Sequence, residues 1–265
     1  MTILQALILG AVQGLTEFLP ISSSGHLVLV PVLFGWQPHP LVFDTFLHLG
    51  TTMAVVIYFW RDLLGALRST LSKDSEASKN RNLLVLLIVG SIPAGIIGFL
   101  FEDYFELYFR SVTSVAIFLL LGSVLMFLAE KLYTRVWDAN RIKDEKSISW
   151  QKSLIIGLFQ SLALFSGFSR SGSSISGGML FGLSREMAAR FSFLLSVPIV
   201  VVAATFKIYD SFNLFVLDGA LVGGFFASFV SGYIAIDFLL KFLKSNKLYV
   251  FIVYRVILAV VLLAV

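Results

Sequence analysis

The chain contains no cysteine, and this absence removes several kinds of chemistry. Without Cys among its 265 residues, it has no disulfide bond, no thiolate nucleophile and no Cys-ligated metal. Charged residues are also scarce, at 14% of the chain, where soluble domains carry roughly one quarter. Hydrophobic residues make up 58%, and the mean hydropathy is +0.91. The composition therefore predicts an integral membrane protein.

The net charge of +4 and the isoelectric point near 9.3 are basic. A basic balance can indicate nucleic-acid binding, but in a chain this apolar it favours basic loops beside an anionic lipid leaflet. We therefore expect the bilayer to be a partner of the chain and expect no nucleic-acid partner.

Long apolar runs divide the chain into two kinds of segment. Two of them, residues 3–35 and 151–182, are broken by the polar stretches LPISSSG and SGFSRSG. Their first arms of about 15 residues reach roughly 22 Å as helix, too short for a bilayer core of about 30 Å. We predict that both are re-entrant helix–loop–helix hairpins. Six uninterrupted runs are predicted to span: 41–60, 83–101, 113–130, 186–206, 218–240 and 248–264.

The distribution of Lys and Arg predicts an orientation. Four proposed cytoplasmic loops hold 16 of the 20 basic residues, whereas the opposite loops hold only Arg110 and Lys207. This assignment works only if each hairpin returns to the side from which it entered, and it places both termini outside. The cytoplasmic loops are 61–82, 130–152, 182–190 and 241–247.

The chain also repeats itself. An offset of 147 residues places 7–35 on 154–182, with 12 of 29 positions identical, and half of these are Gly, Ser or Gln. We infer one membrane domain built of two repeats, about 1–130 and about 151–265, each with one hairpin and three spans. Three is odd, so the second repeat is inverted, an arrangement that builds central sites from broken helices.

The two copies differ where chemistry would occur. The first carries an acid and an imidazole, and the second carries a guanidinium. The differing pairs are Glu17 and Leu164, Ser23 and Arg170, and His26 and Ser173.

The hairpin centres have the pattern of anion sites. Gln13 and Glu17 share one helix face, and Pro20 ends that helix. The stretches Ser22-Ser23-Ser24 and Ser169-Arg170-Ser171 then precede a restarting helix, where N-cap residues and free N–H groups attract anions. Two such helix N-termini suit a diphosphate better than a single carboxylate.

The charged groups allow two mechanisms. Arg170 offers a planar fork that fits phosphate oxygens, and His26 can exchange a proton near neutral pH. Ser23 could attack phosphorus with Glu17 or His26 as base. Alternatively, Glu17 could hold a divalent cation that polarises a water. The residues alone do not choose between these mechanisms.

Structural explanations compete with the functional ones. Ser22 and Ser24 could satisfy backbone groups, Gln13 could join helices, and Glu17 could form an ion pair with Arg170.

Other polar residues are assigned structural roles. Asp44 and His48, one turn apart, are expected to support the site. Asp237 and Arg255 are expected to pair or to reach the cytoplasmic interface. The segments 61–82 and 130–152 are predicted to be solvated, charged loops.

Three stretches carry a family resemblance. QGLTEFLPISSSGHLVL (Gln13–Leu29) and SGFSRSGSSISGGMLFGLSREMAARFSFLLSVP (Ser166–Pro198) resemble the two signatures of the bacterial undecaprenyl-diphosphate phosphatases, the bacitracin-resistance phosphatases. FDTFLHLGTTMAVV (Phe43–Val56) is also similar to the family. The resemblance covers essentially the full length. It implies an all-α membrane fold of six spans and two re-entrant hairpins in an inverted repeat.

The resemblance also implies a function. Family members hydrolyse undecaprenyl diphosphate to undecaprenyl phosphate and inorganic phosphate, which recycles the carrier lipid for peptidoglycan and other cell-wall polymers. The expected site faces the outer side of the bacterial plasma membrane, the expected cofactor is Mg²⁺ or Ca²⁺, and a homodimer is left open. A transporter or flippase of an anionic prenyl lipid is the rival reading, because the inverted repeat favours it equally. A non-catalytic lipid-binding scaffold is the third.

The resemblance carries over to particular residues. Ser166 stands where the family often has Pro, and Ser174 where it often has Thr. The catalytic set would be Glu17, Ser23, His26 and Arg170. The substrate-binding set would be Gln13, Ser22, Ser24, Ser169, Ser171, Gly172 and Ser174.

Overall fold

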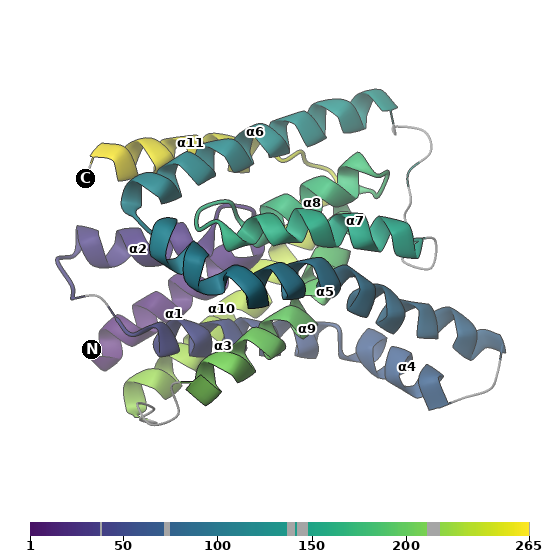
Figure 1. Ribbon diagram of the computed structural model, residues 1–265, viewed down its shortest axis with the longest axis horizontal. Helices are drawn as coiled ribbons and strands as arrows, with labels where there is room; N and C mark the ends of the chain where they lie inside the picture. The colour runs from purple at the N-terminus through teal and green to yellow at the C-terminus, as the bar shows by residue number, and fades with distance from the viewer. Residues whose placement is uncertain (38, 72–74, 137–140, 142–147, 211–217, 265) are drawn as a thin grey trace.

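The fold is helical throughout the described part of the chain. The computed structural model describes all residues except 38, 72–74, 137–140, 142–147, 211–217 and 265 (Figure 1). No strand occurs among the described residues. The elements are α1 (Ile3–Phe18), α2 (Ser23–Leu33), α3 (Leu41–Tyr58), α4 (Trp60–Leu71), α5 (Ser75–Tyr108), α6 (Val112–Val136), α7 (Trp150–Ser161), η2 (Leu162–Leu164), α8 (Arg170–Leu180), α9 (Arg185–Asp210), α10 (Gly219–Leu243) and α11 (Tyr249–Ala264).

Several helices are suited to a bilayer, so the chain is a multi-pass membrane protein. Four stretches are long and apolar enough to cross, Leu83–Phe101, Val112–Val136, Arg185–Tyr209 and Gly219–Leu243. The pair Val42–Tyr58 and Trp60–Ser69, bent by 74°, counts as a fifth if it is one span. Large apolar side chains are exposed on these helices, as at Phe99, which is 72% exposed. Lipid tails would cover such a surface.

The prediction of a solvated loop over 61–82 was wrong. The structure has a helix, α4, over most of its first half, and α5 begins at Ser75. Charged residues of α4 lie at helical spacing beside Ala66, which is buried. Asp62 pairs with Arg190 of α9 at 2.7 Å, so the charges lie along a helix that packs on its neighbours.

The two polar-centred segments form two helix pairs. In Figure 1, α1 begins near the end of the molecule at which α2 finishes, and the pair α7–α8 enters from the opposite end. The second helices, α2 and α8, begin and end at positions 147 residues apart. Their N-caps, Ser22 and Ser169, both have positive φ, 72° and 73°. A shared, costly backbone geometry indicates that both turns are held by their surroundings.

Small residues let the first helices of these pairs approach the long helices closely. A methyl group on Gly157 of α7 would overlap the backbone of Gly90 in α5. A methyl on Gly10, its counterpart in α1, would overlap Gly224 in α10. Such contacts are typical of helix packing inside membranes. They bring both broken segments to the centre of the bundle.

Candidate active site

The two hairpin turns meet and are joined by hydrogen bonds. The Gly167 N–H donates to Ser24 Oγ at 3.2 Å, and the Ser171 hydroxyl donates to the Leu19 carbonyl at 3.1 Å. Ser24 and Ser171 are counterparts in the repeat, so the two hydrogen bonds between the turns are nearly symmetric. Because each turn is bonded to the other, the N-termini of α2 and α8 are brought to one place.

Glu17 lies at the centre of the meeting point. Its Oε2 accepts hydrogen bonds from Ser23 Oγ at 2.6 Å and from Gln13 Nε2 at 2.9 Å. Its Oε1 accepts from Arg170 Nη2 at 2.6 Å. Ser23 and Arg170 are the first residues of α2 and α8, so one carboxylate joins the N-termini of both helices. The Glu17–Arg170 ion pair that competed with the functional reading is therefore present.

Arg170 is also held from its other side. Its Nη1 donates to the Ser192 carbonyl of α9 at 3.2 Å. The Ser174 hydroxyl lies 2.6 Å from Ser192 Oγ and donates to the Arg170 carbonyl at 2.7 Å. Together, the Ser192 and Glu17 bonds engage two of the five N–H donors of the guanidinium, which leaves donor capacity for a phosphate. Ser192 was not a candidate from the sequence, although it lies in the family-like stretch Ser166–Pro198, which was the signal that could have found it.

His26 faces α11 and not the Glu17 carboxylate. Its Nδ1 lies 2.7 Å from the Ser22 carbonyl, so Nδ1 carries the proton, and Nε2 accepts from the Tyr254 hydroxyl at 2.6 Å. The two rings are stacked, and His26 is buried. The structure therefore places Glu17, and not His26, in contact with the Ser23 hydroxyl.

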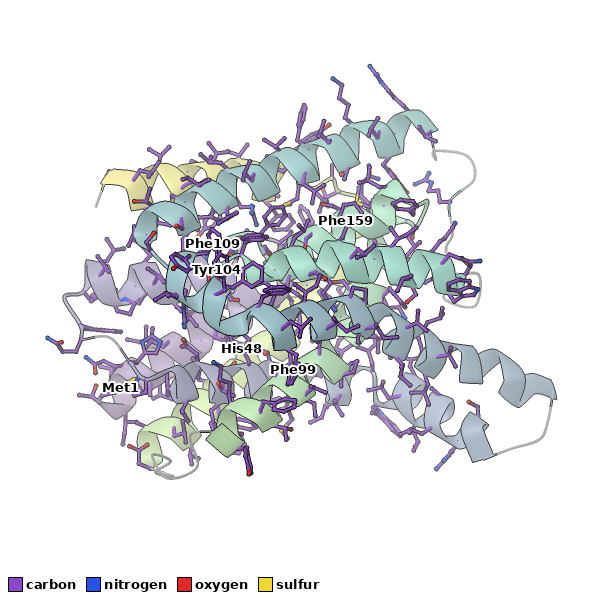
Figure 2. The ribbon with its side chains drawn as sticks, viewed as in Figure 1. Met1, His48, Phe99, Tyr104, Phe109 and Phe159 are labelled. Atoms are coloured by element: carbon purple, nitrogen blue, oxygen red, sulfur yellow. The ribbon has the colours of Figure 1, made fainter. Side chains whose placement is uncertain are left out.

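His48 lies closer to the carboxylate than the sequence indicated. Its Nε2 is 3.6 Å from Glu17 Oε2, and its Nδ1 donates to the Asp44 carbonyl at 2.7 Å. Because the Asp44 carbonyl can only accept, this bond places a proton on Nδ1. The His48 side chain is 33% exposed, more open than the Glu17 and Arg170 side chains, at 6% and 13%. His48 lies on α3 (Figure 2), and the family-like stretch around it was the signal that could have placed it here.

The other predicted binding residues shape the turns. Ser22 and Ser169 accept from the N–H groups of Gly25 and Gly172, at 3.4 and 3.2 Å, and cap their helices. Gln13 has one buried atom, Oε1, without a partner in the described part of the chain.

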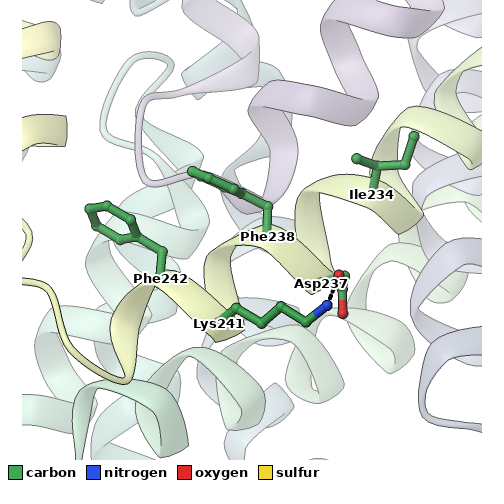
Figure 3. A pocket seen from close by; sticks show the side chains of 5 residues that line it. All are labelled: Ile234, Asp237, Phe238, Lys241 and Phe242. Carbon is green, nitrogen blue, oxygen red and sulfur yellow. Dashed lines mark hydrogen bonds and ion pairs between the residues drawn. The ribbon is translucent and has the colours of Figure 1, made fainter.

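Asp237 and Arg255 do not pair with each other in the described structure, and the interfacial position predicted for Arg255 was wrong. Asp237 pairs with Lys241 at 2.7 Å, and the hollow that these two line on α10 shares no residue with the Glu17 cluster (Figure 3). Arg255 is fully buried and donates to backbone carbonyls of both hairpin turns. It has polar partners in the protein interior and has no need to reach the interface.

Comparison with known proteins identifies the family. The family described as bacitracin resistance protein BacA matches residues 6–261. The chain belongs to the BacA family. Curated relatives named undecaprenyl-diphosphatase include the proteins of Moorella thermoacetica, 43% identical over 265 residues, and Methanosphaera stadtmanae, 40% identical over 272 residues. These alignments cover 100% and 98% of this chain, and 98% and 96% of the relatives.

The resemblance to this family implied Mg²⁺ or Ca²⁺, but the Glu17 cluster offers few free oxygen ligands for such a cation. Hard divalent cations take six or more oxygen ligands. Both Glu17 oxygens already accept from N–H or O–H donors, one of them cationic. No group of three His, Cys, Asp or Glu side chains suited to a metal occurs among the described residues. These side chains do not by themselves fit a protein-held cation, and cation dependence stays a prediction.

Proposed function

We propose that this BacA-family chain hydrolyses undecaprenyl diphosphate to undecaprenyl phosphate and inorganic phosphate, and so recycles a carrier lipid for cell-wall polymers. Relatives that carry this activity in their names align over at least 98% of the chain. The observation that carries the proposal is the contact of one carboxylate, Glu17, with both a hydroxyl and a guanidinium. A nucleophile beside a base and an anion-binding group is what phosphoryl transfer requires.

The geometry favours Ser23 as the nucleophile. Its hydroxyl donates to Glu17 Oε2 at 2.6 Å, so the carboxylate can take the proton as Oγ attacks the terminal phosphorus. The P–O bond to the bridging oxygen breaks, undecaprenyl phosphate leaves with that oxygen, and Ser23 carries the phosphoryl group. Water then attacks the phosphoserine, which releases inorganic phosphate and restores the hydroxyl. Phosphoserine at residue 23 after rapid acid quenching would support this route over direct attack by water.

Arg170 and the two helix N-termini are the proposed diphosphate site. Arg170 begins α8, and Ser23 begins α2, so N–H groups of both helices lie beside the Glu17 cluster. Helix N-termini carry partial positive charge and attract phosphate. This arrangement would neutralise the charge that accumulates on the transferring phosphoryl oxygens.

The proposed setting is the bacterial plasma membrane, with six spans, two re-entrant hairpins in inverted repeat, and the site open to the outer side. The matched bounds of α2 and α8 and the uneven distribution of Lys and Arg support it. The cysteine-free chain permits a direct test, because Ser111 and Ser245 are both exposed. Ser111→Cys should react with an impermeant maleimide only from outside, and Ser245→Cys only from the cytoplasm. Labelling of both from one side would refute this topology.

The function is tested by phosphate release from undecaprenyl diphosphate by the purified protein in detergent. Ser23→Ala is the matched negative variant, because it removes one hydroxyl from the site. Turnover in the parent chain and loss of turnover in Ser23→Ala support the proposal. Binding of the lipid without turnover would instead favour a carrier or scaffold.

A further inference from the structure

Arg255 of α11 is the largest fully buried side chain in the described structure, and the mechanism above does not use it. No carboxylate pairs with it among the described residues. A buried charge without an ionic partner is costly unless hydrogen bonds satisfy it. Its surroundings therefore have to supply those bonds.

The five hydrogen bonds of Arg255 connect three parts of the molecule. Its Nη1 donates to the Pro20 carbonyl in the first hairpin turn at 3.3 Å. Its Nη2 donates to the Gly167 and Phe168 carbonyls in the second turn, at 3.2 and 3.1 Å. The remaining two bonds go to α6, to Ser123 Oγ at 3.1 Å and to the Leu119 carbonyl at 3.0 Å.

The turns present opposite polarities on their two sides. Pro20 follows the C-terminus of α1, and Gly167 and Phe168 follow α7 and η2, so Arg255 lies where the carbonyl ends of both broken helices point. Helix C-termini carry partial negative charge and favour a cation. The N-termini of α2 and α8, which favour an anion, begin at Ser23 and Arg170. A cation from α11 thus stabilises the carbonyl ends of the same turns whose N–H ends form the proposed diphosphate site.

We propose that Arg255 is a positioning residue that holds the two hairpin turns in register, so that Ser23 and Arg170 both reach Glu17. The proposal rests on the proposed function for its kinetic consequence but not for its structural one. Without the guanidinium, the hydrogen bonds that join the turns within the described structure are the Ser24–Gly167 and Ser171–Leu19 bonds and the Glu17 contacts themselves.

Two variants test the positioning role of Arg255 in different ways. Arg255→Lys keeps the charge but cannot reach five acceptors in a planar array. Gly122→Ala keeps the arginine at position 255 but adds a methyl group that would overlap Arg255 Nη2 and lie 2.7 Å from the Phe168 carbonyl oxygen. The guanidinium would therefore have to shift away from the turns. Gly95→Ala is the matched control, because its methyl meets nothing nearer than Ile199 Cδ1 at 3.8 Å.

Hydrogen exchange gives a readout that does not depend on activity. In Arg255→Lys and in Gly122→Ala, deuterium uptake should rise in both turn segments, 19–25 and 165–172, while α10 keeps its protection. Gly95→Ala should match the parent chain. If Arg255→Lys does not fold, hydrogen exchange in Gly122→Ala still tests the positioning role. Unchanged uptake in the turns, a rise confined to one hairpin, or a uniform rise over all helices would overturn the proposal.

The kinetic test is a double-mutant cycle with Arg170→Lys. Misplacement of about 1 Å can cost on the order of 10²-fold, so Arg255→Lys should lower kcat/KM by about 10- to 100-fold. Because both residues act through the same alignment, the double variant should lose far less than the product of the single losses. A loss equal to the product would mean general destabilisation and would overturn the positioning role. A parent chain without turnover would instead refute the proposed function, and the exchange measurement would still test the positioning role of Arg255.

Discussion

Replacing Glu17 with Gln separates its two roles. The amide has nearly the same shape as the carboxylate but cannot take a proton from the Ser23 hydroxyl, which lies 2.6 Å away. It also ends the ion pair with Arg170 at 2.6 Å. The variant therefore removes the proposed base and frees the proposed phosphate-binding group at the same time.

The two effects should lower kcat and KM for different reasons. Loss of a positioned base costs about 10²–10⁴-fold, so kcat should fall by an amount in this range. KM should fall as well, by several-fold, because Arg170 no longer shares its donors with a carboxylate. Repulsion between a carboxylate and a phosphate also ends, and two unit charges 4 Å apart at an effective dielectric constant of 20 interact by about 4 kcal/mol, an upper bound here.

The assay is phosphate release over a range of lipid diphosphate concentrations, with kcat and KM determined separately. Glu186→Gln is the matched control, because it makes the same substitution at a carboxylate 3.5 Å from Lys244, outside the site. It should leave both constants near those of the parent chain. A raised KM with unchanged kcat in Glu17→Gln would refute the reasoning, since it would mean that Glu17 only binds substrate.

Three further predictions rest on the same geometry, and a fourth rests on the family resemblance. Arg170→Lys should lower kcat/KM by about 10²-fold or more in a folded protein, because an ammonium group cannot bind both Glu17 and a phosphate as a planar guanidinium does. Near-normal turnover would exclude Arg170 as the diphosphate-binding group. His26→Ala should lower kcat by less than the roughly 10²-fold minimum for a lost acid–base group, because the imidazole contacts the Ser22 carbonyl and the Tyr254 hydroxyl and not the Glu17 carboxylate. Tyr254→Phe, which keeps the stacked ring but removes one hydrogen bond, should cost less still. A loss of about 10²-fold or more in His26→Ala would show that the imidazole takes part in proton transfer. Gln160→Ala should cost less than about 10-fold in kcat, below the range for a lost acid–base group, because this buried amide has no partner among the described residues; abolished turnover would contradict the division of labour between the repeats. A chelator should stop phosphate release, whereas calorimetry of the lipid-free protein should find no stoichiometric Ca²⁺ or Mg²⁺ site; a tight site would show that protein ligands suffice.

The two helix pairs could be predicted because residues close together in the sequence determine where each helix ends and restarts. The apolar runs, Pro20 and the Ser-rich N-caps indicate where helices end and restart, and the offset of 147 residues indicates that both pairs are alike. The structure has α2 and α8 at matching bounds. A positive φ at Ser22 and Ser169 could not be predicted, because these non-glycine residues hold it only through the packing of both turns.

Contacts between distant residues were harder to predict. The sequence indicated which charges would be costly in a membrane and offered the Glu17–Arg170 ion pair, but it did not indicate the partners of Arg255 or His48. Arg255 was assigned to the interface because its partners, the carbonyls of two turns, carry no sequence signal. His48 likewise reaches Glu17 only because α3 packs beside α1. Helix α4 was missed because many charges in a short segment resemble a loop unless their spacing is examined.

The central claim is that Glu17 activates Ser23 at the meeting point of the two hairpins. The most direct test incubates the purified parent chain and its Glu17→Gln and Ser23→Ala variants with undecaprenyl diphosphate in detergent and measures inorganic phosphate. The account predicts steady phosphate release by the parent chain and a loss of about 10²–10⁴-fold in Glu17→Gln. It predicts loss of phosphate release in Ser23→Ala. Full activity in well-folded Ser23→Ala, or no release by the parent chain, would contradict it.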